Sequence, residues 1–159
     1  MHIAVVSDTH MPRGARALPE GCVERLRAAD LILHAGDFTG AVFLEWLRGL
    51  GPPVEAVVGN MDEPSLQASL PETRIVEADG LRIGMVHIPG QREGRAARLT
   101  AMFPGCDAIV YGHTHLPEVE RARGVWILNP GSPTERRRAP EKTMIELVDG
   151  APALVSLGT

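Results

Sequence analysis

The chain has 159 residues, enough for one domain with a hydrophobic core but too few for two sizeable independent domains. Hydrophobic residues make up 44% and charged residues 23%, which excludes a disordered or fibrous protein. Lys and Arg number 16 against 20 Asp and Glu, and the formal net charge of -4 gives no support to a nucleic-acid partner. We expect one domain over residues 1–159.

The N-terminal residues predict a strand and not a signal peptide, because no basic segment precedes their short apolar run. No apolar stretch approaches the roughly 18 residues that a membrane helix needs. We therefore expect a cytoplasmic protein with no membrane partner. Cys22 and Cys106 form no CxxC pair and are expected to be reduced, partly buried thiols.

The first two thirds of the chain alternate between short apolar runs and amphipathic stretches. Several runs are bounded by Gly or Pro, as expected for strands that are covered on both faces. The predicted strands are Ile3–Val6, Leu31–His34, Val54–Val58, Arg74–Ala78, Leu81–His87 and Ala108–Tyr111. The predicted helices are Glu20–Ala28, Ala41–Leu50 and Arg92–Phe103. This alternation predicts βαβ units and a largely parallel sheet.

After about Pro117 the pattern changes to strand after strand. The predicted strands are Glu118–Arg121, Val125–Leu128, Thr143–Val148 and Pro152–Leu157. Asp149-Gly150 is a strong hairpin signal, as is Asp79-Gly80 earlier in the chain. We expect one mixed, mainly parallel sheet and one mostly antiparallel sheet, packed face to face with helices outside as a layered α/β sandwich.

Seven side chains that can bind metal follow five of the predicted strands. They are Asp8 and His10 in Ser-Asp-Thr-His, Asp37 in Gly-Asp, Asn60 in Gly-Asn, His87, and His113 with His115 in Gly-His-Thr-His. Alone, Gly-Asp is a turn signal and His87 is typical of a satisfied buried histidine. Sites in open α/β sheets gather beyond the carboxyl ends of the strands, so the conjunction of these motifs predicts one shared metal site.

The ligand types restrict the metal and the reaction. Two carboxylates, one amide oxygen and four imidazoles are too rich in nitrogen for Ca²⁺ or Mg²⁺, and Mn²⁺, Fe, Zn²⁺, Ni²⁺ or Co²⁺ would fit. Seven ligands exceed what one ion takes from a protein, whereas two ions that share a carboxylate account for all of them. Such a pair clamps phosphoryl oxygens while a bridging hydroxide attacks in line, which suits phosphoester hydrolysis.

Five ordered motifs and a later Asn-Pro-Gly-Ser segment carry a resemblance to a known family. The segments are Ser7-Asp8-Thr9-His10, His34-Ala35-Gly36-Asp37, Gly59-Asn60, His87, Gly112-His113-Thr114-His115 and Asn129-Pro130-Gly131-Ser132. In this order they resemble the calcineurin-like metallophosphoesterases, most closely the small bacterial and archaeal phosphodiesterase branch. The resemblance runs from Met1 to about Leu157. It implies a four-layer αββα sandwich of two mixed sheets packed face to face with helices outside.

The resemblance also implies roles for the seven residues. The first metal would be held by Asp8, His10 and His115, and the second by Asn60, His87 and His113, with Asp37 as the bridge. Asn60 would also orient the phosphate, so Asp37 and Asn60 are the candidate catalytic residues. The implied cofactors are two divalent transition-metal ions, Mn²⁺ first, with Ni²⁺, Co²⁺, Zn²⁺ or Fe as alternatives. The implied substrate is a small phosphoester, and a homo-oligomer remains open.

The sequence departs from the family pattern at two places. Met61 stands where many phosphatases have a histidine that protonates the leaving group, and methionine cannot donate a proton. Pro89 replaces the second histidine of the branch's Thr-His-Gly-His motif.

Several basic residues near the motifs have two interpretations. Arg136-Arg137-Arg138 is read as a solvated turn in preference to a set of phosphate contacts. Arg92, near a predicted helix start, is a candidate substrate contact. His34 is interpreted as packed or satisfied in preference to supporting a ligand, and His2 as inert.

Two alternatives to a phosphodiesterase stay open. One is a non-catalytic protein-binding scaffold, because the eukaryotic retromer subunit resembles this branch and departs from the full ligand set. The other is a phosphomonoesterase or nuclease that uses the same site, with the acidic balance against long polyanions.

Overall fold

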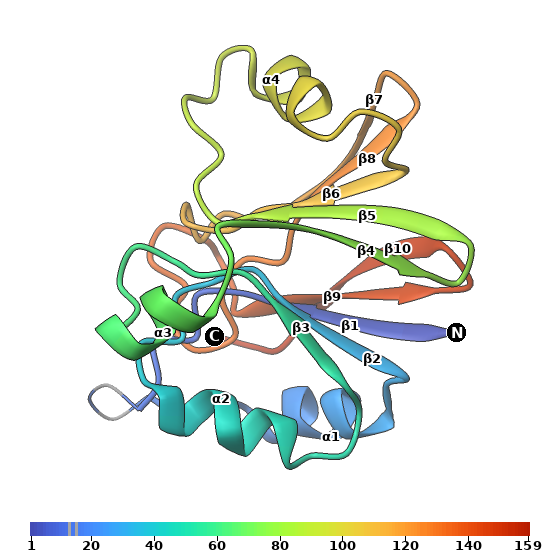
Figure 1. Cartoon of the computed structure of the whole chain (residues 1–159). Coiled ribbons are helices and arrows are strands. Elements are labelled where there is room, and N and C mark those ends of the chain that lie inside the picture. The colour runs from blue at the N-terminus through green and yellow to red at the C-terminus, as the bar shows by residue number, and fades with distance from the viewer. Residues whose placement is uncertain (13, 15) are drawn as a thin grey trace.

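Two five-stranded sheets form the centre of the molecule, and the computed structural model describes them within residues 1–12, 14 and 16–159 (Figure 1). The first sheet contains, in spatial order, β10 (Ala151–Ser156), β9 (Thr143–Val148), β1 (His2–Val6), β2 (Leu31–His34) and β3 (Val54–Ala56). The second contains β4 (Thr73–Ala78), β5 (Leu81–Val86), β6 (Ala108–Val110), β8 (Val125–Asn129) and β7 (Glu118–Ala122).

Helices cover the outer faces of the two sheets. Figure 1 shows α1 (Glu20–Ala28) and α2 (Ala41–Arg48) beneath the first sheet and α4 (Arg95–Met102) above the second. A short helix, α3 (Pro64–Ser69), lies beyond the end of β3. The predicted layered sandwich is therefore confirmed. No described helix is long and apolar enough to cross a membrane.

The alternation of side chains along the central strands explains the layers. Ile3 and Val5 of β1 belong to a buried cluster with Ile83 and Met85 of β5, which fills the space between the sheets. The intervening residues Ala4 and Val6 face the opposite way and belong to the cluster that contains the apolar sides of α1 and α2. Because both faces are buried, these strands read as continuous apolar runs.

The outer face of the second sheet packs against α4. Ile109 and Tyr111 cluster there with Leu99 and Phe103. Gly84 in β5 permits this approach, since a Cβ atom at that position would lie 2.5 Å from the Phe103 ring. Close packing of the helix therefore needs glycine here.

The division of strands between the sheets differs from the sequence-based prediction. In the first sheet β1, β2 and β3 are parallel, β9 is antiparallel to β1, and β10 is antiparallel to β9. In the second, β5, β6 and β8 are parallel while β4 and β7 are antiparallel to their neighbours. Both sheets are thus mixed, as the family resemblance implies, whereas the expectation of one mostly antiparallel sheet from the strand pattern was wrong. The hairpin signals fix the local pairs β4–β5 and β9–β10, but they carry no information on which sheet a hairpin joins.

Two helices differ from the prediction. The α4 helix begins at Arg95 and not Arg92, because Gly94 in front of it adopts a left-handed conformation with φ of 71°. The α3 helix was not predicted: it has six residues, begins with Pro64 and buries only Leu66. So short a segment offers no helical periodicity to detect.

Candidate metal centre

The segments that follow five parallel strands meet at one end of the sandwich. Asp8 and His10 follow β1, Asp37 follows β2, Asn60 follows β3, His87 follows β5, and His113 and His115 follow β6. All seven candidate ligands that the sequence predicts therefore reach the same region. The expected convergence at the carboxyl ends of the strands is met.

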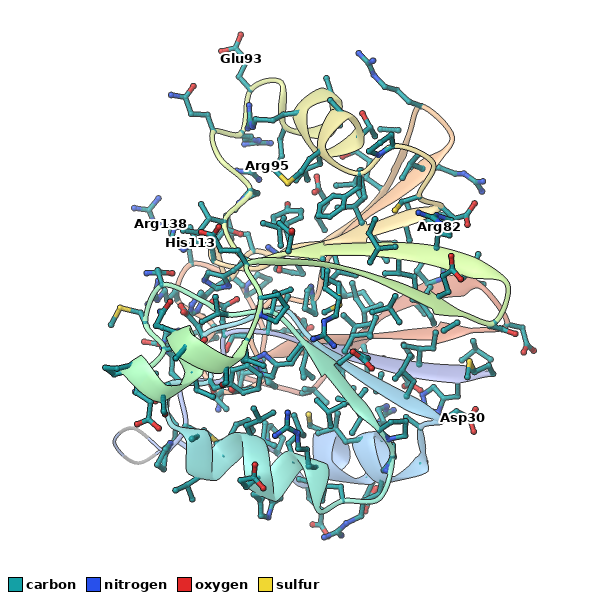
Figure 2. The ribbon with its side chains drawn as sticks, in the orientation of Figure 1. Asp30, Arg82, Glu93, Arg95, His113 and Arg138 are labelled. Carbon is teal, nitrogen blue, oxygen red and sulfur yellow. The ribbon has the colours of Figure 1, made fainter. Side chains whose placement is uncertain are left out.

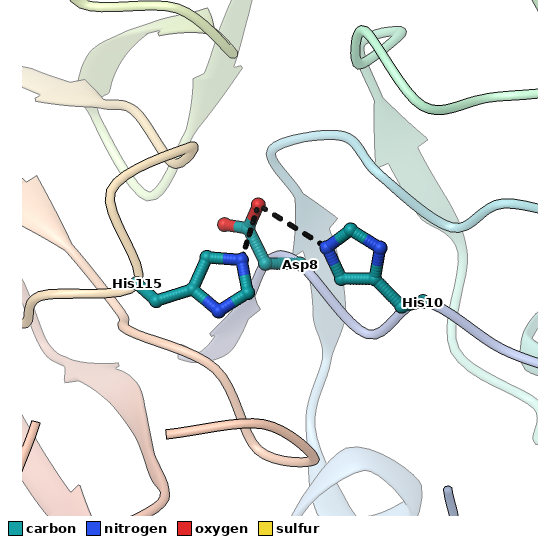
Figure 3. A group of neighbouring side chains, drawn as sticks. All are labelled: Asp8, His10 and His115. Carbon is teal, nitrogen blue, oxygen red and sulfur yellow. Dashed lines mark ion pairs between the residues drawn. The ribbon is translucent and has the colours of Figure 1, made fainter. Parts of the chain in front are cut away.

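Three buried side chains form the first group of candidate ligands (Figure 3). The Oδ1 atom of Asp8 lies 3.4 Å from Nε2 of His115 and 3.9 Å from Nε2 of His10. Ligands that each lie about 2.1 Å from one ion stand about 3–4 Å apart, so the spacing fits a shared metal. Among the described residues, Asp8 Oδ1 and His10 Nε2 have no hydrogen-bond partner although both are buried. A cation between them would satisfy both atoms.

The second group lies beside the first and shares Asp8 with it. The Nε2 atom of His87 lies 3.2 Å from Asp37 Oδ2, 3.8 Å from Asp8 Oδ1 and 2.9 Å from Asn60 Oδ1. The same amide oxygen lies 3.1 Å from Nδ1 of His113. Asp37 Oδ2 also lies 3.6 Å from His10 Nε2 of the first group. Both carboxylates therefore stand between the groups, whereas the family resemblance gives the bridge to Asp37 alone.

The protonation of His87 provides a second test of the fit. Its Nδ1 atom lies 2.7 Å from the carbonyl oxygen of Ala35, which can only accept a hydrogen bond. Its Nε2 atom faces carboxylate and amide oxygens, which are also acceptors. Burial acts to lower the pKa of His87, yet the carboxylates of Asp37 and Asp8 raise it above its ordinary value. The position therefore favours a positive charge, which a bound metal ion would supply in place of the proton.

Each carboxylate has one oxygen engaged by the protein and the other directed at the centre. Asp8 Oδ2 accepts hydrogen bonds from the Ser7 hydroxyl at 2.7 Å and the His113 amide at 3.0 Å. Asp37 Oδ1 accepts one from the Met61 amide at 2.8 Å. Burial acts to raise both pKa values, but contacts with His115 for Asp8 and His87 for Asp37 hold them below the ordinary value. Both groups are thus ionised and available as ligands.

The backbone at the ligands is strained. Asp8, His10, Asp37, His113 and His115 adopt φ values between 48° and 73°, in the left-handed region that side chains other than glycine rarely occupy. Such strain persists only where surrounding contacts fix it, and it concentrates at functional sites. None of the sequence motifs predicted this strain.

Residues outside the predicted set hold these turns. Ser132 donates to the carbonyl of Asp8 at 2.8 Å and Thr134 donates to that of Thr9 at 2.7 Å. Asn129 donates to the Thr114 hydroxyl at 2.9 Å. The Asn-Pro-Gly-Ser segment therefore supports two ligand turns from behind.

Asp62 is a site residue that the sequence reasoning missed. Its carboxylate accepts backbone hydrogen bonds from Gly59 at 2.6 Å, and from Asp37 and Thr39 at 3.2 Å each. It thereby fixes the exit of β3 to the exit of β2. The Gly-Asn-Met-Asp segment contains Asp62, but a carboxylate that binds only backbone amides has no spacing signature.

His34 combines the two interpretations given above. Its Nδ1 atom accepts from the Gly36 amide at 3.1 Å, which leaves Nε2 to donate to the Thr9 hydroxyl at 3.1 Å. The ring stacks on Phe38, and complete burial lowers the pKa of His34 to about 3. It is a satisfied, neutral histidine that also ties the β1 and β2 exits together. His2 lies elsewhere, 2.6 Å from the Glu146 carboxylate.

A cavity of about 330 Å³ opens over the ligands. It is lined by His10, Arg16, Asp37, Asn60, Met61, His113, Glu135 and Arg137. A second cavity of about 360 Å³ shares Asn60 with the first, and its wall also includes His87, Glu72, Ile88 and Met102. Both volumes fall within the range of small-molecule sites.

Arg92, the candidate substrate contact, lies apart from the seven candidate ligands. It lines a different cavity, together with Arg95, Glu118 and Arg123, and none of the seven ligands lines that cavity. The loop after β5 leads away from the centre toward α4. Pro89 lies in this loop, where its carbonyl accepts from Arg98 Nη2 at 3.2 Å.

The two-sheet sandwich with adjacent metal-ligand groups at its strand ends defines the class of metal-binding phosphoesterase folds. A family model described as the calcineurin-like phosphoesterase superfamily domain matches residues 1–149. The chain belongs to the calcineurin-like phosphoesterase superfamily, as the motifs in its sequence predict.

Relatives of similar length support this assignment. A probable metallophosphoesterase of Methanothermobacter thermautotrophicus is 37% identical over 94% of this chain and 87% of its own length. A phosphodiesterase of Methanocaldococcus jannaschii is 26% identical over 82% of this chain and 83% of its own. The solved structure of Vps29 from Entamoeba histolytica complexed with Zn²⁺ has a TM-score of 0.76 and 28% identity, covering 99% of this chain and 100% of that one.

Metal binding is expected to stabilise the folded protein. A ligand that binds only the folded state at 100 times its Kd contributes about 2.7 kcal/mol. For a domain of this size that corresponds to a rise in Tm of roughly 5–10 °C for one occupied site. We expect such a rise when Mn²⁺ is added to stripped protein in differential scanning calorimetry.

Two variants make this prediction specific. His115→Ala should reduce the rise, because it removes a ligand of the first group. His2→Gln is the matched control and should retain it, since His2 lies away from the centre. An equal rise in both variants would show that the metal binds elsewhere.

Proposed function

We propose that the protein is a metal-dependent phosphodiesterase that hydrolyses small phosphoesters. One observation carries the proposal: all seven ligand positions of the family pattern are filled, and their side chains gather at one centre. The relatives described as a metallophosphoesterase and a phosphodiesterase support the same class of reaction.

The residues have distinct proposed roles. Asp8, His10 and His115 hold one ion, while Asn60, His87 and His113 hold the other, with Asp37 between them. Two divalent ions, Mn²⁺ first with Ni²⁺, Co²⁺, Zn²⁺ or Fe as alternatives, supply Lewis-acid activation of water and of the phosphoryl oxygens. The Nδ1 atoms of His87 and His115 donate to the carbonyl oxygens of Ala35 and Glu135, and these bonds fix the two rings so that each Nε2 faces the centre.

The amide of Asn60 serves the substrate as well as the metal. With Oδ1 turned toward His87 and His113, its NH₂ group remains as a hydrogen-bond donor. Asn60 lines both cavities, so each of the two substituents of a diester bound beside it has a cavity to occupy. This arrangement favours a diester over a monoester.

A non-catalytic protein-binding scaffold is the second candidate. It is favoured by the similarity to Vps29 and by an apolar cavity of about 290 Å³ whose wall includes the exposed Val42 and Trp46. A scaffold does not, however, require strained ligand turns directed at one centre. We therefore rank catalysis first.

Replacement of Asp37, the carboxylate that the proposal places between the two ions, tests the proposed activity. Asp37→Asn should lower kcat/KM for bis(p-nitrophenyl) phosphate by at least about 100-fold, beyond the usual effect of losing an outer partner of a ligand. The protein is stripped of metal and assayed with Mn²⁺, Ni²⁺, Co²⁺, Zn²⁺ and Mg²⁺ in turn. Asp149→Asn, an isosteric change in the exposed β9–β10 turn, is the control and should retain activity. Absence of hydrolysis with every metal would favour the scaffold.

The leaving group should control the rate strongly. Met61 lines the cavity and cannot protonate a leaving oxygen. Burial acts to raise the pKa of Glu135, but Arg16 holds it below the ordinary value, so this carboxyl is ionised at neutral pH. We expect log kcat/KM to fall steadily as the leaving-group pKa rises across a series of aryl methyl phosphates. A kcat/KM that does not depend on the leaving-group pKa would contradict the absence of a general acid.

Restoring a proton donor should flatten that dependence. Met61→His places an imidazole in the cavity, and its slope should be shallower than that of the wild type. Val148→His is the control, because Val148 is similarly exposed (49% against 46%) but lines neither cavity.

A further inference from the structure

The rim of the metal cavity carries two arginines and one carboxylate. Arg16 and Arg137 line the same cavity as His10, Asn60 and His113. Glu135 lies between them, with carboxylate oxygens 3.0 Å from Arg16 Nη2 and 3.9 Å from Arg137 Nε. Two guanidinium groups thus face one carboxylate, on a chain whose overall charge is -4. The rim is a local concentration of positive charge.

The three consecutive arginines have different environments. Arg136 donates to the carbonyl of Ala139 at 3.1 Å and does not line the cavity. Arg138 is exposed, at the left edge of the molecule in Figure 2, and also lies outside the wall of the cavity. Arg137, with half of its side chain exposed, does line it. Arg137 is thus exposed, as a solvated turn predicts, but it also lines the cavity over the candidate ligands.

The backbone fixes Arg137 relative to the metal ligands. The carbonyl of Glu135 accepts from Nδ1 of His115 at 2.9 Å, and its amide donates to the Ser132 hydroxyl at 2.9 Å. Ser132 in turn donates to the carbonyl of Asp8. Arg137 itself adopts a left-handed φ of 47°. The loop that presents Arg137 is thus bonded directly to two candidate ligands.

We propose that the preferred substrates carry a second anionic group, such as a phosphate or phosphonate, which Arg137 and Arg16 bind at this rim. The inference rests on the proposed phosphoesterase function. The single negative charge of a diester is already met by the divalent ions, so the additional guanidinium groups favour an additional anion. Arg137, at 3.9 Å from Glu135, has donors for it, and bidentate pairing is the usual way in which arginine binds phosphate.

Two diesters with the same leaving group test the inference. They are ethyl p-nitrophenyl phosphate and 2-phosphonoethyl p-nitrophenyl phosphate, assayed with the Mn²⁺-loaded protein. We expect kcat/KM to be about tenfold higher for the phosphonoethyl ester, the effect of one hydrogen bond between charged groups, and chiefly through KM. Arg137→Gln should abolish the preference and Arg16→Gln should reduce it. Arg136→Gln is the matched control and should retain it.

A binding measurement separates this inference from the proposed activity. Propane-1,3-diphosphonate and propylphosphonate are titrated into Mn²⁺-loaded protein in a calorimeter. We expect the diphosphonate to bind about tenfold more tightly in the wild type and the Arg136→Gln variant, but not in Arg137→Gln. If neither ester is hydrolysed while this pattern holds, the anion site stands and the proposed activity fails.

Other outcomes would overturn the inference. Equal affinity for the two phosphonates in the wild type would show that the protein has no second anion site. A preference that survives in both Arg137→Gln and Arg16→Gln would place that site elsewhere. An equal loss for both esters on changing Arg137 would mean that this residue binds the reacting phosphate.

Discussion

The candidate metal centre depends on the different contacts that the two carboxylate oxygens of each buried aspartate make. In Asp8 and Asp37, one oxygen accepts hydrogen bonds from amide and hydroxyl groups while the other faces histidine nitrogens. An ionised carboxylate is costly to bury unless its charge is compensated, and hydrogen bonds to one oxygen leave the other to be met by a cation. The rest of the structure places these two groups side by side.

The geometry of the sandwich brings the two aspartates together. Parallel strands within each sheet direct their carboxyl ends to one edge, and the shared core brings the edges of the two sheets together. The chain then leaves the strands through left-handed turns, which Asp62, Ser132 and Thr134 hold by hydrogen bonds. The stability of the sheets thus maintains strain at the ligands.

Much of this arrangement could be predicted from the sequence. Apolar runs gave the central strands, and the polar residues after them gave all seven candidate ligands, because both signals are local. The assignment of β7 and β8 to one sheet and β9 and β10 to the other was not predictable, since pairing between distant strands leaves no local pattern. Asp62 was missed because its partners are backbone amides. Arg137 lines the cavity over the candidate ligands, whereas Arg92 lines another cavity. The direction of each loop, and not proximity in sequence, decides which side chain reaches a cavity.

The central claim is that these turns bring seven side chains together as a site for two ions. Crystals of the protein grown with Mn²⁺ and measured for anomalous scattering test it most directly. The account predicts two peaks, one among Asp8, His10 and His115 and the other among Asn60, His87 and His113, with Asp37 adjacent to both. A single peak, or peaks remote from these residues, would contradict it.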